Sequence, residues 1–248
     1  MNVFPQITVI TVCYNAEASI EKTIGTVLNQ NYPNIEYIIV DGASTDKTQD
    51  ILRAYEGKIS KIVSQADRGI YDAMNKGINL ASSEYILFLN ADDYFLNESA
   101  IENAMRHVQL DKRDCIFYGD IVSVDQETGA GSIWSPKKDV SAHFLFKGSL
   151  PHPSTIYKAS LFQLLGHYDD SFRISADYEF YVRAFVNGVH IKHIPVLMTV
   201  FSTNGISSDN NYKELLKREN ERVRLTHFSL AKRLALRLRV RIKKLFNI

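Results

Sequence analysis

The stretch Tyr85-Ile86-Leu87-Phe88-Leu89-Asn90-Ala91-Asp92-Asp93 runs from an apolar segment directly into two carboxylates. A short, uninterrupted apolar run between polar residues is typical of a strand that is buried on both faces of a parallel sheet. In open α/β sheets, ligands bind outside the carboxyl ends of the strands. The stretch therefore predicts a parallel sheet with acidic side chains at its ligand-binding edge.

Upstream of this stretch, strand patterns and helix patterns alternate. Apolar, largely β-branched runs predict strands at 7–13, 35–40 and 59–64. Apolar residues at helical spacing predict helices near 20–28, 51–55 and 71–80. This alternation of strands and helices over residues 1–110 predicts an α/β fold with a doubly wound, mostly parallel sheet that has helices on both faces.

Downstream, the predicted elements shorten and pair locally. A glycine-containing turn between the strands 116–124 and 132–134 predicts an antiparallel hairpin. Further helices are expected near 97–105, 161–165 and 178–187, and a short strand near 191–194. We expect a small antiparallel region in this second half.

Composition indicates a globular chain. Hydrophobic residues make up 45% and charged residues 23% of 248 residues, which excludes collagen-like, disordered and disulfide-framework proteins. Cys13 lies in an apolar run, and nothing in the sequence supports a disulfide with Cys115. No apolar run approaches the length of a membrane span, and residues 1–5 show no secretory signal. These features predict a cytoplasmic protein.

Charge is unevenly distributed. Net charge is +1, yet residues 226–248 hold seven basic residues and no acidic one, which leaves 22 basic against 28 acidic residues elsewhere, a net of −6. Leucine and isoleucine side chains in this tail fall largely on one helical face and basic ones on the other, as in a helix that lies on an anionic membrane. A strand over 236–242 and a helix packed on the domain are alternatives.

Two adjacent carboxylates, Asp92 and Asp93, repel one another unless a cation or solvent relieves the repulsion. Hard oxygen ligands suit Mg²⁺ or Mn²⁺, which commonly bridge carboxylates to the phosphates of a substrate. This predicts a divalent metal and a substrate with a diphosphate. A surface turn before the next helix is the alternative.

Three other residues are candidates for chemistry. Asp41 closes a predicted strand, where it could accept hydrogen bonds from a ribose or base, or could cap the next helix. Asp177 falls near a predicted helix N-terminus, which favours an ionised general base but also an N-cap. His152, between Pro151 and Pro153, could contact an acceptor or phosphate, or be structural. A G-x-G-x-x-G fingerprint does not follow the first strand, which disfavours NAD.

Five ordered motifs accompany residues 85–93. They are Thr11-Val12-Cys13-Tyr14-Asn15, Ile39-Val40-Asp41-Gly42-Ala43-Ser44-Thr45-Asp46, Asp67-Arg68-Gly69-Ile70-Tyr71-Asp72-Ala73-Met74-Asn75-Lys76-Gly77, Ser175 to Phe180, and Asn204-Gly205-Ile206-Ser207. In this order they resemble family 2 glycosyltransferases of the GT-A fold, especially bacterial surface-polysaccharide enzymes of the colanic-acid type. The resemblance covers about residues 5–207.

The resemblance implies a Rossmann-like sheet with a small antiparallel acceptor-side region and C-terminal helices. The domain would span 1–210, with a nucleotide-sugar-binding half at 1–110 and an acceptor half at 111–210. Residues 211–248 would form a basic amphipathic helical tail.

Roles for particular residues follow from the resemblance alone. Asp41 matches the acid that contacts the donor nucleotide. The family's loop that lines the base of the donor nucleotide corresponds to Thr11, Tyr14 and Asn15. The family's segment beside the ribose and diphosphate corresponds to Asp67, Arg68, Asn75 and Lys76.

The metal and acceptor sites are implied in the same way. Asn90, Ala91 and Asp92 occupy the family's Asp-x-Asp site, with Asn in place of the first acid, so Asp92, helped by Asp93, is the implied metal ligand. Asp177 matches the catalytic base, with Glu179 in reserve, and His152 matches a loop near the acceptor.

The implied reaction is an inverting, metal-dependent transfer of one sugar from a UDP-, GDP- or TDP-sugar to a glycan or polyprenyl-linked acceptor. The Gln-x-x-Arg-Trp signature of processive synthases is missing, because the single tryptophan, Trp134, follows Ile133. The acceptor would lie at the inner face of the membrane, where the basic tail would bind. A sugar-nucleotide nucleotidyltransferase and a nucleic-acid-binding module remain alternatives, although the acidic body disfavours nucleic acid.

Overall fold

The computed structural model describes residues 4–111, 113, 115–125, 128–136, 140–202, 212–231 and 233–236. Across these ranges, no helix combines the length and the apolarity that a membrane span requires. Cys13 and Cys115 are both buried and are not joined in a disulfide.

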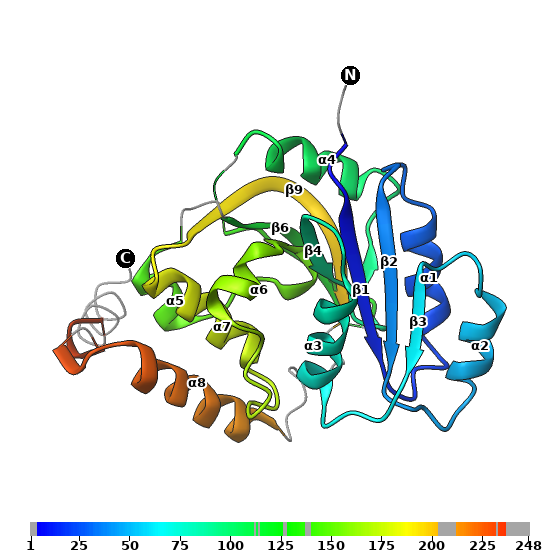
Figure 1. Ribbon diagram of the computed structural model, residues 1–248. Coiled ribbons are helices and arrows are strands. Elements are labelled where there is room, and N and C mark those ends of the chain that lie inside the picture. Colours follow the sequence, from blue (N-terminus) through cyan, green and yellow to red (C-terminus); the bar gives the residue numbers. More distant parts are fainter. Residues whose placement is uncertain are drawn as a thin grey trace.

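The first half of the chain forms a parallel sheet in the order β3-β2-β1-β4 (Figure 1). Its strands are β1 (Ile7–Cys13), β2 (Ile35–Asp41), β3 (Lys61–Ser64) and β4 (Tyr85–Phe88). Every residue of β1 and β4 is buried, as expected for strands with helices on both faces. The predicted α/β alternation is confirmed.

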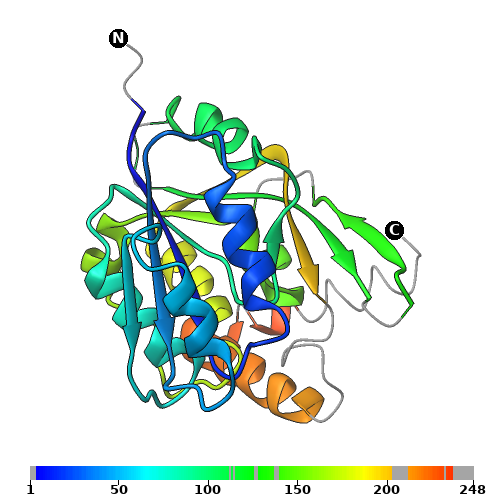
Figure 2. The same cartoon turned by 90° about the vertical axis from the view of Figure 1, so that its right-hand side faces the viewer.

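Helices cover both faces of this sheet (Figures 1 and 2). They are α1 (Ile20–Leu28), α2 (Thr48–Ala54), α3 (Ile70–Leu80) and α4 (Ala100–Val108). Side chains alternate across β1, so Ile10 packs in the core beneath α3, whereas Ile7 and Val9 pack in the opposite core with α1 and α4. Gly77 lets α3 lie close to the sheet, because a Cβ there would come 2.5 Å from Cγ2 of Ile10.

The second half extends the sheet in the order β4-β8-β6-β9-β5. The added strands are β5 (Tyr94–Phe95), β6 (Cys115–Val124), β7 (Gly131–Trp134), β8 (Thr155–Lys158) and β9 (His190–Ser202). β6 and β7 form the predicted antiparallel hairpin, which projects from the body in Figure 2. β8 is antiparallel to both neighbours, but β9 runs parallel to β6.

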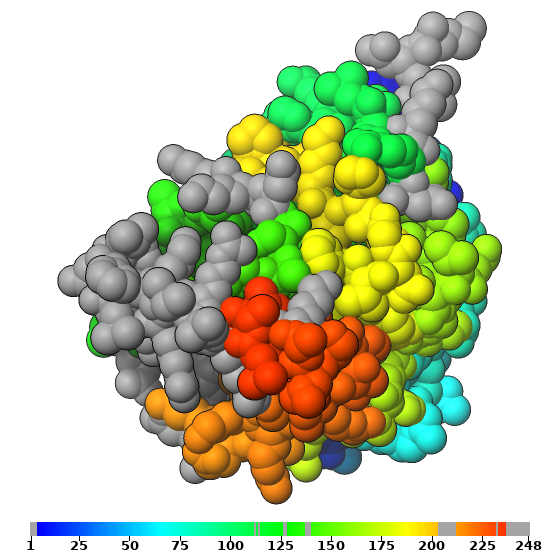
Figure 3. Space-filling model, turned by 90° about the vertical axis from the view of Figure 1, so that its left-hand side faces the viewer, coloured from blue at the N-terminus to red at the C-terminus, as the bar shows by residue number. Residues whose placement is uncertain are grey.

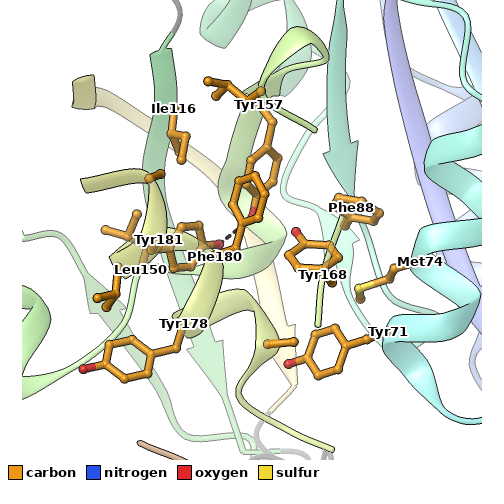
Figure 4. Close-up of a cluster of buried hydrophobic side chains, with 14 of the residues drawn as sticks. Tyr71, Met74, Phe88, Ile116, Leu150, Tyr157, Tyr168, Tyr178, Phe180 and Tyr181 are labelled. Carbon is orange, nitrogen blue, oxygen red and sulfur yellow. Dashed lines mark hydrogen bonds between the residues drawn. The ribbon is translucent and has the colours of Figure 1, made fainter. Parts of the chain in front are cut away.

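The remaining helices pack on the α3 side of the sheet. They are α5 (Ala142–Lys147), the 3₁₀ turn η1 (His152–Ser154), α6 (Ser160–Leu165), α7 (Ala176–Val186) and α8 (Lys213–His227). Aromatic rings fill the space beneath them (Figure 4). Phe162 and Phe180 stack at 4.8 Å, and the hydroxyls of Tyr157 and Tyr181 hydrogen-bond at 2.7 Å.

Several boundaries differ from the sequence prediction. The strand expected at 191–194 is the 13-residue β9, whose pairing with β6 is broken by irregular register near Asp120. The helix expected at 97–105 begins at Ala100, and the strand expected at 59–64 begins at Lys61. Short β5, β8 and α5 were not predicted, because elements of two to six residues carry too little periodicity.

The beginning of the C-terminal tail packs on the domain. Phe228 and Leu236 are 2% and 8% exposed and belong to the same core as α7. Figure 3 shows this orange and red segment on the surface beside yellow and yellow-green residues. The predicted membrane-binding helix depends mainly on Arg237, Arg239, Arg241, Lys243 and Lys244, which lie outside the described residues.

Candidate active site

A cavity of about 380 Å³ opens where β1 and β4 end and α7 begins. The sheet order brings these strand ends together although they are far apart in sequence. Seven residues expected at the site line the cavity: Tyr14, Asn15, Asn90, Ala91, Asp92, His152 and Asp177. The parallel sheet therefore assembles the centre of the predicted site.

Asp92 and Asn90 present oxygen atoms at this cavity. Burial raises the pKa of Asp92 above its usual value, and the buried Oδ1 of Asn90 has no hydrogen-bond partner. A hard divalent cation fits both observations, because it favours the charged carboxylate and accepts an amide oxygen as ligand. In the described part of the chain, no cluster of three or more His, Cys, Asp or Glu side chains could hold a metal. Substrate phosphates and water would have to supply the other ligands.

Asp93 lies apart from this cavity. Its side chain is 1% exposed, and its Oδ1 accepts a hydrogen bond of 3.2 Å from the backbone N–H of Ser202, at the end of β9. Burial and the nearby charge of Asp92 raise the pKa of Asp93 well above its usual value. The structure thus places the predicted second ligand behind the cavity wall, against β9.

Asp177 stands between two cavities. A larger one, of about 1130 Å³, lies on its other side and is lined by Trp134, Phe144 and Ser149 among others. The residues common to both walls are His152, Pro153, Ile174, Asp177 and Phe201. Oδ1 of Asp177 accepts a hydrogen bond of 2.9 Å from the hydroxyl of Tyr71 on α3. A single carboxylate can therefore reach molecules bound in either cavity.

Glu179, the reserve candidate, is on the same helix but faces elsewhere. It is 6% exposed and lines neither cavity. Burial opposes its ionisation, but hydrogen bonds from His227 and Arg183 outweigh burial and lower the pKa of Glu179. Its interactions connect α7 to α8.

His152 forms part of the wall between the cavities. Its ring stacks on Phe88 at 5.3 Å, and its Nε2 lies 3.3 Å from the hydroxyl of Tyr168. Burial lowers the pKa of His152, so the ring is neutral near pH 7. Packing fixes this side chain beside Asp177.

Asp41 organises a turn and does not line the cavity. It is fully buried, and its carboxylate accepts hydrogen bonds from the backbone N–H of Ser44 at 3.1 Å and the hydroxyl of Ser64 at 2.6 Å. Ser44 in turn accepts a hydrogen bond from the N–H of Asn15, and Asn15 Oδ1 accepts one from the N–H of Thr45. Asp41 thereby fixes the loop that carries Tyr14 and Asn15 into the cavity.

Tyr14 and Asp67 meet above Gly42. A Cβ on Gly42 would lie 2.5 Å from Oδ2 of Asp67 and 3.3 Å from Cδ2 of Tyr14, so only glycine leaves room for both. The ring of Tyr14 is 63% exposed. The structure therefore brings together an accessible aromatic ring and a carboxylate, a pair suited to a nucleoside.

Four predicted residues take part in other contacts. Thr11 is buried against the hydroxyl of Tyr37. Arg68 pairs with Asp72 and Asp170, Lys76 with Asp72, and Asn75 bonds both backbone polar groups of Tyr168. None of the four lines the cavity. Asn75 holds the segment after α6 against α3.

Sequence reasoning missed three polar residues of the cavity, Ser19, Tyr71 and Arg173. Tyr71 belongs to the sequence motif at 67–77 and lies on α3. The motif alone could not show that the Tyr71 hydroxyl contacts Asp177, which is more than 100 residues later in the chain. Arg173 lies in the loop before α7, where a single basic residue gives no sequence signal.

A family model described as Glycosyl transferase family 2 matches residues 8–169. The chain belongs to glycosyltransferase family 2. A "PGL/p-HBAD biosynthesis glycosyltransferase" of Mycobacterium bovis is 28% identical over 219 residues, which are 86% of this chain and 84% of that protein. The resemblance found in the sequence is confirmed, and the protein is an enzyme that transfers a sugar.

Solved structures share the fold. TarS of S. aureus with UDP-GlcNAc has a TM-score of 0.72 and 20% identity, covering 90% of this chain and 68% of that one. In the complex of TarS 1–349 with UDP, the match covers 79% of this chain and 60% of that one, so this chain spans only part of the length of that structure. A mannosyltransferase from Pyrobaculum calidifontis, in complex with GDP-Man and Mn²⁺, has a TM-score of 0.64 and 17% identity, covering 98% and 81%. The chain therefore has the GT-A fold.

Proposed function

We propose that this glycosyltransferase is inverting and metal-dependent, and that it moves one sugar from a nucleoside diphosphate sugar to a hydroxyl of a glycan or lipid-linked acceptor in bacterial surface-polysaccharide biosynthesis. The observation that carries the proposal is the position of Asp177 between a smaller cavity beside Asp92 and a larger one. Two substrates can then meet at one carboxylate.

The donor would occupy the smaller cavity. Tyr14, in the loop held through Asp41, offers an aromatic face for the nucleoside, and Asp67, in the segment after β3, offers a hydrogen-bond acceptor. Asp92 and the amide oxygen of Asn90 would hold Mg²⁺ or Mn²⁺. When bound, the ion supplies charge neutralisation for the diphosphate. The complexes of TarS with UDP-GlcNAc and of the mannosyltransferase with GDP-Man and Mn²⁺ support a donor of this class.

The acceptor would enter the larger cavity, where Trp134 and Phe144 provide apolar surface and Ser149 a buried hydroxyl without a partner. A carboxylate oxygen of Asp177 takes the proton of the acceptor hydroxyl while that oxygen forms a bond to C1 of the sugar. The bond from C1 to the diphosphate oxygen breaks on the opposite face, and the nucleoside diphosphate leaves with the bonding electrons. One displacement inverts the anomeric centre.

Membrane association is part of the proposal but rests on sequence. An acceptor anchored by a polyprenyl chain lies at the inner membrane face, and the basic residues after 236 would bind anionic lipid there. This would hold the enzyme, peripherally bound, next to its acceptor.

A donor screen tests the proposal. The protein would be incubated with UDP-, GDP- and TDP-sugars in Mn²⁺ or in EDTA, and released nucleoside diphosphate and pyrophosphate would be measured. We expect nucleoside diphosphate from one donor class, only with metal, and NMR of the product should show an inverted anomeric centre. Pyrophosphate release would instead indicate a nucleotidyltransferase, and retained configuration would exclude the single displacement.

A further inference from the structure

The cavity beside Asp92 contains one basic side chain. Arg173 is the only arginine or lysine in its wall within the described ranges. The side chain belongs to the loop between α6 and α7, four residues before Asp177. Arg173 and the proposed base therefore line the cavity from one short stretch of chain, and Asp92 lines the same cavity.

Among the residues that the structure describes, no carboxylate pairs with the guanidinium of Arg173. No ion pair joins it to an acidic residue of the described chain, whereas Arg68 contacts both Asp72 and Asp170. The guanidinium makes a cation–π contact with Tyr212, and the Cζ atom of Arg173 lies 5.6 Å from the centroid of the Tyr212 ring. Arg173 is exposed, so its fork of N–H donors is accessible to an anion.

Helix α8 holds the loop that carries Arg173. The carboxylate of Glu219, 8% exposed, accepts hydrogen bonds from the backbone N–H groups of Arg173 at 2.7 Å and Ile174 at 3.0 Å. One turn later, Arg222 donates to Ser171 at 2.8 Å and lies 4.0 Å from the ring of Phe172. In Figure 1 this yellow-green loop reaches down to the orange helix α8. The backbone at Arg173 is thus fixed before any ligand binds.

We propose that Arg173 binds the diphosphate of the donor, and that Glu219 is a positioning residue that fixes Arg173 through its backbone; this inference rests on the proposed function. A nucleoside diphosphate gains negative charge as it leaves the sugar, and Asp92 and Asp177 are both acidic. A guanidinium forms paired, charge-assisted hydrogen bonds to phosphate oxygens. Arg173 therefore supplies the positive side-chain charge that Arg68, paired at the surface, does not.

Binding measurements on purified full-length protein test Arg173. Arg173→Gln should weaken UDP or GDP binding in calorimetry by about 10- to 100-fold, while the affinity for uridine or guanosine should not change. Arg173→Lys should show a smaller loss, because it keeps the charge but not the fork. Arg218→Gln, an exposed arginine of α8 outside the cavity, is the matched control and should bind as the wild type does.

Glu219 is tested by a double-mutant cycle. Glu219→Gln should weaken diphosphate binding by about 3- to 10-fold, and the effects of Glu219→Gln and Arg173→Gln should not add, because both act on one contact. Glu214→Gln, at an exposed position of the same helix, is the control. Additive losses would show that Glu219 serves folding alone and would overturn its positioning role.

The outcomes separate this inference from the proposed function. A wild type that binds neither UDP, GDP nor TDP contradicts the proposed function itself. A wild type that binds one of them while Arg173→Gln binds it equally well contradicts only the role of Arg173. Equal losses for diphosphate and nucleoside would mean that Arg173 supports the fold, which also overturns the inference.

Discussion

Asp41 and Asp177 occupy comparable places in the sequence, each near the start of a turn or helix, yet their surroundings differ. Asp41 is fully buried, and Ser44 and Ser64 donate hydrogen bonds to its carboxylate. Asp177 is half-buried in the wall of two cavities and, among the described residues, accepts a hydrogen bond from Tyr71. A carboxylate whose oxygens are already satisfied organises backbone, whereas one with free acceptor capacity beside a cavity can exchange a proton.

Removing the charge of Asp177 should have the largest effect. Asp177→Asn keeps the shape but cannot take the acceptor's proton, so kcat should fall by about 1000-fold. Steady-state transfer assays measure this, with nucleoside diphosphate affinity and the thermal midpoint as controls. A kcat within about 3-fold of the wild type would assign the proton transfer to another group.

Asp41→Asn should lower the stability of the folded protein. The amide that replaces one carboxylate oxygen cannot accept from all the Ser44 and Ser64 donors, so the free energy of unfolding should fall by about 2 to 4 kcal/mol. Urea denaturation measures the change. Asp50→Asn, in an exposed pair with Arg53, is the control and should change it by less than about 0.5 kcal/mol. Unchanged stability would mean that Asp41 is not the organising group.

Glu179→Gln compares the two carboxylates of helix α7, Asp177 beside the cavities and Glu179 away from them. Glu179 has a lowered folded pKa, so its contribution to stability is present above the ordinary value of 4.5 and is lost as pH falls through the folded pKa. At pH 7 the variant should be about 2 kcal/mol less stable, and the difference should shrink below pH 4.5. Denaturation across pH tests this. A large loss of kcat in the folded variant would instead make Glu179 the base.

Tyr71→Phe should have the smallest effect. It removes the hydrogen bond to Asp177. The ring stays packed against Tyr168, and both rings are labelled in Figure 4. We expect kcat to fall by about 3- to 10-fold with unchanged stability, because one hydrogen bond orients the carboxylate. Transfer assays and thermal melts measure the two quantities. An unchanged kcat would show that helix α7 alone positions Asp177.

Local patterns were sufficient for the first half of the fold. The strands of residues 7–13 and 85–88 are continuous apolar runs, and continuous burial on both faces produces such runs. β9 was predicted as a fragment, because its buried and exposed positions alternate irregularly and Pro195 interrupts the run. The antiparallel partners of β8 depend on contacts that no local pattern encodes.

The candidate site was only partly predictable for a similar reason. Asp92 and Asp177 were found because they sit where a strand ends and a helix begins. Arg173 was missed, because its place depends on Glu219, 46 residues later in the chain. Arg68 was expected to contact phosphate. Its partner Asp72 is four residues away in the sequence, but Asp170 comes close only in the folded chain.

The wall shared by the two cavities has a consequence for altering this enzyme. Ile174 and Phe201 line both chambers, so a substitution at either residue would alter the proposed donor and acceptor sites together. Trp134 and Phe144 border the larger chamber alone. If the larger chamber holds the acceptor as proposed, substitutions on the hairpin and α5 side should change acceptor preference without altering the smaller chamber.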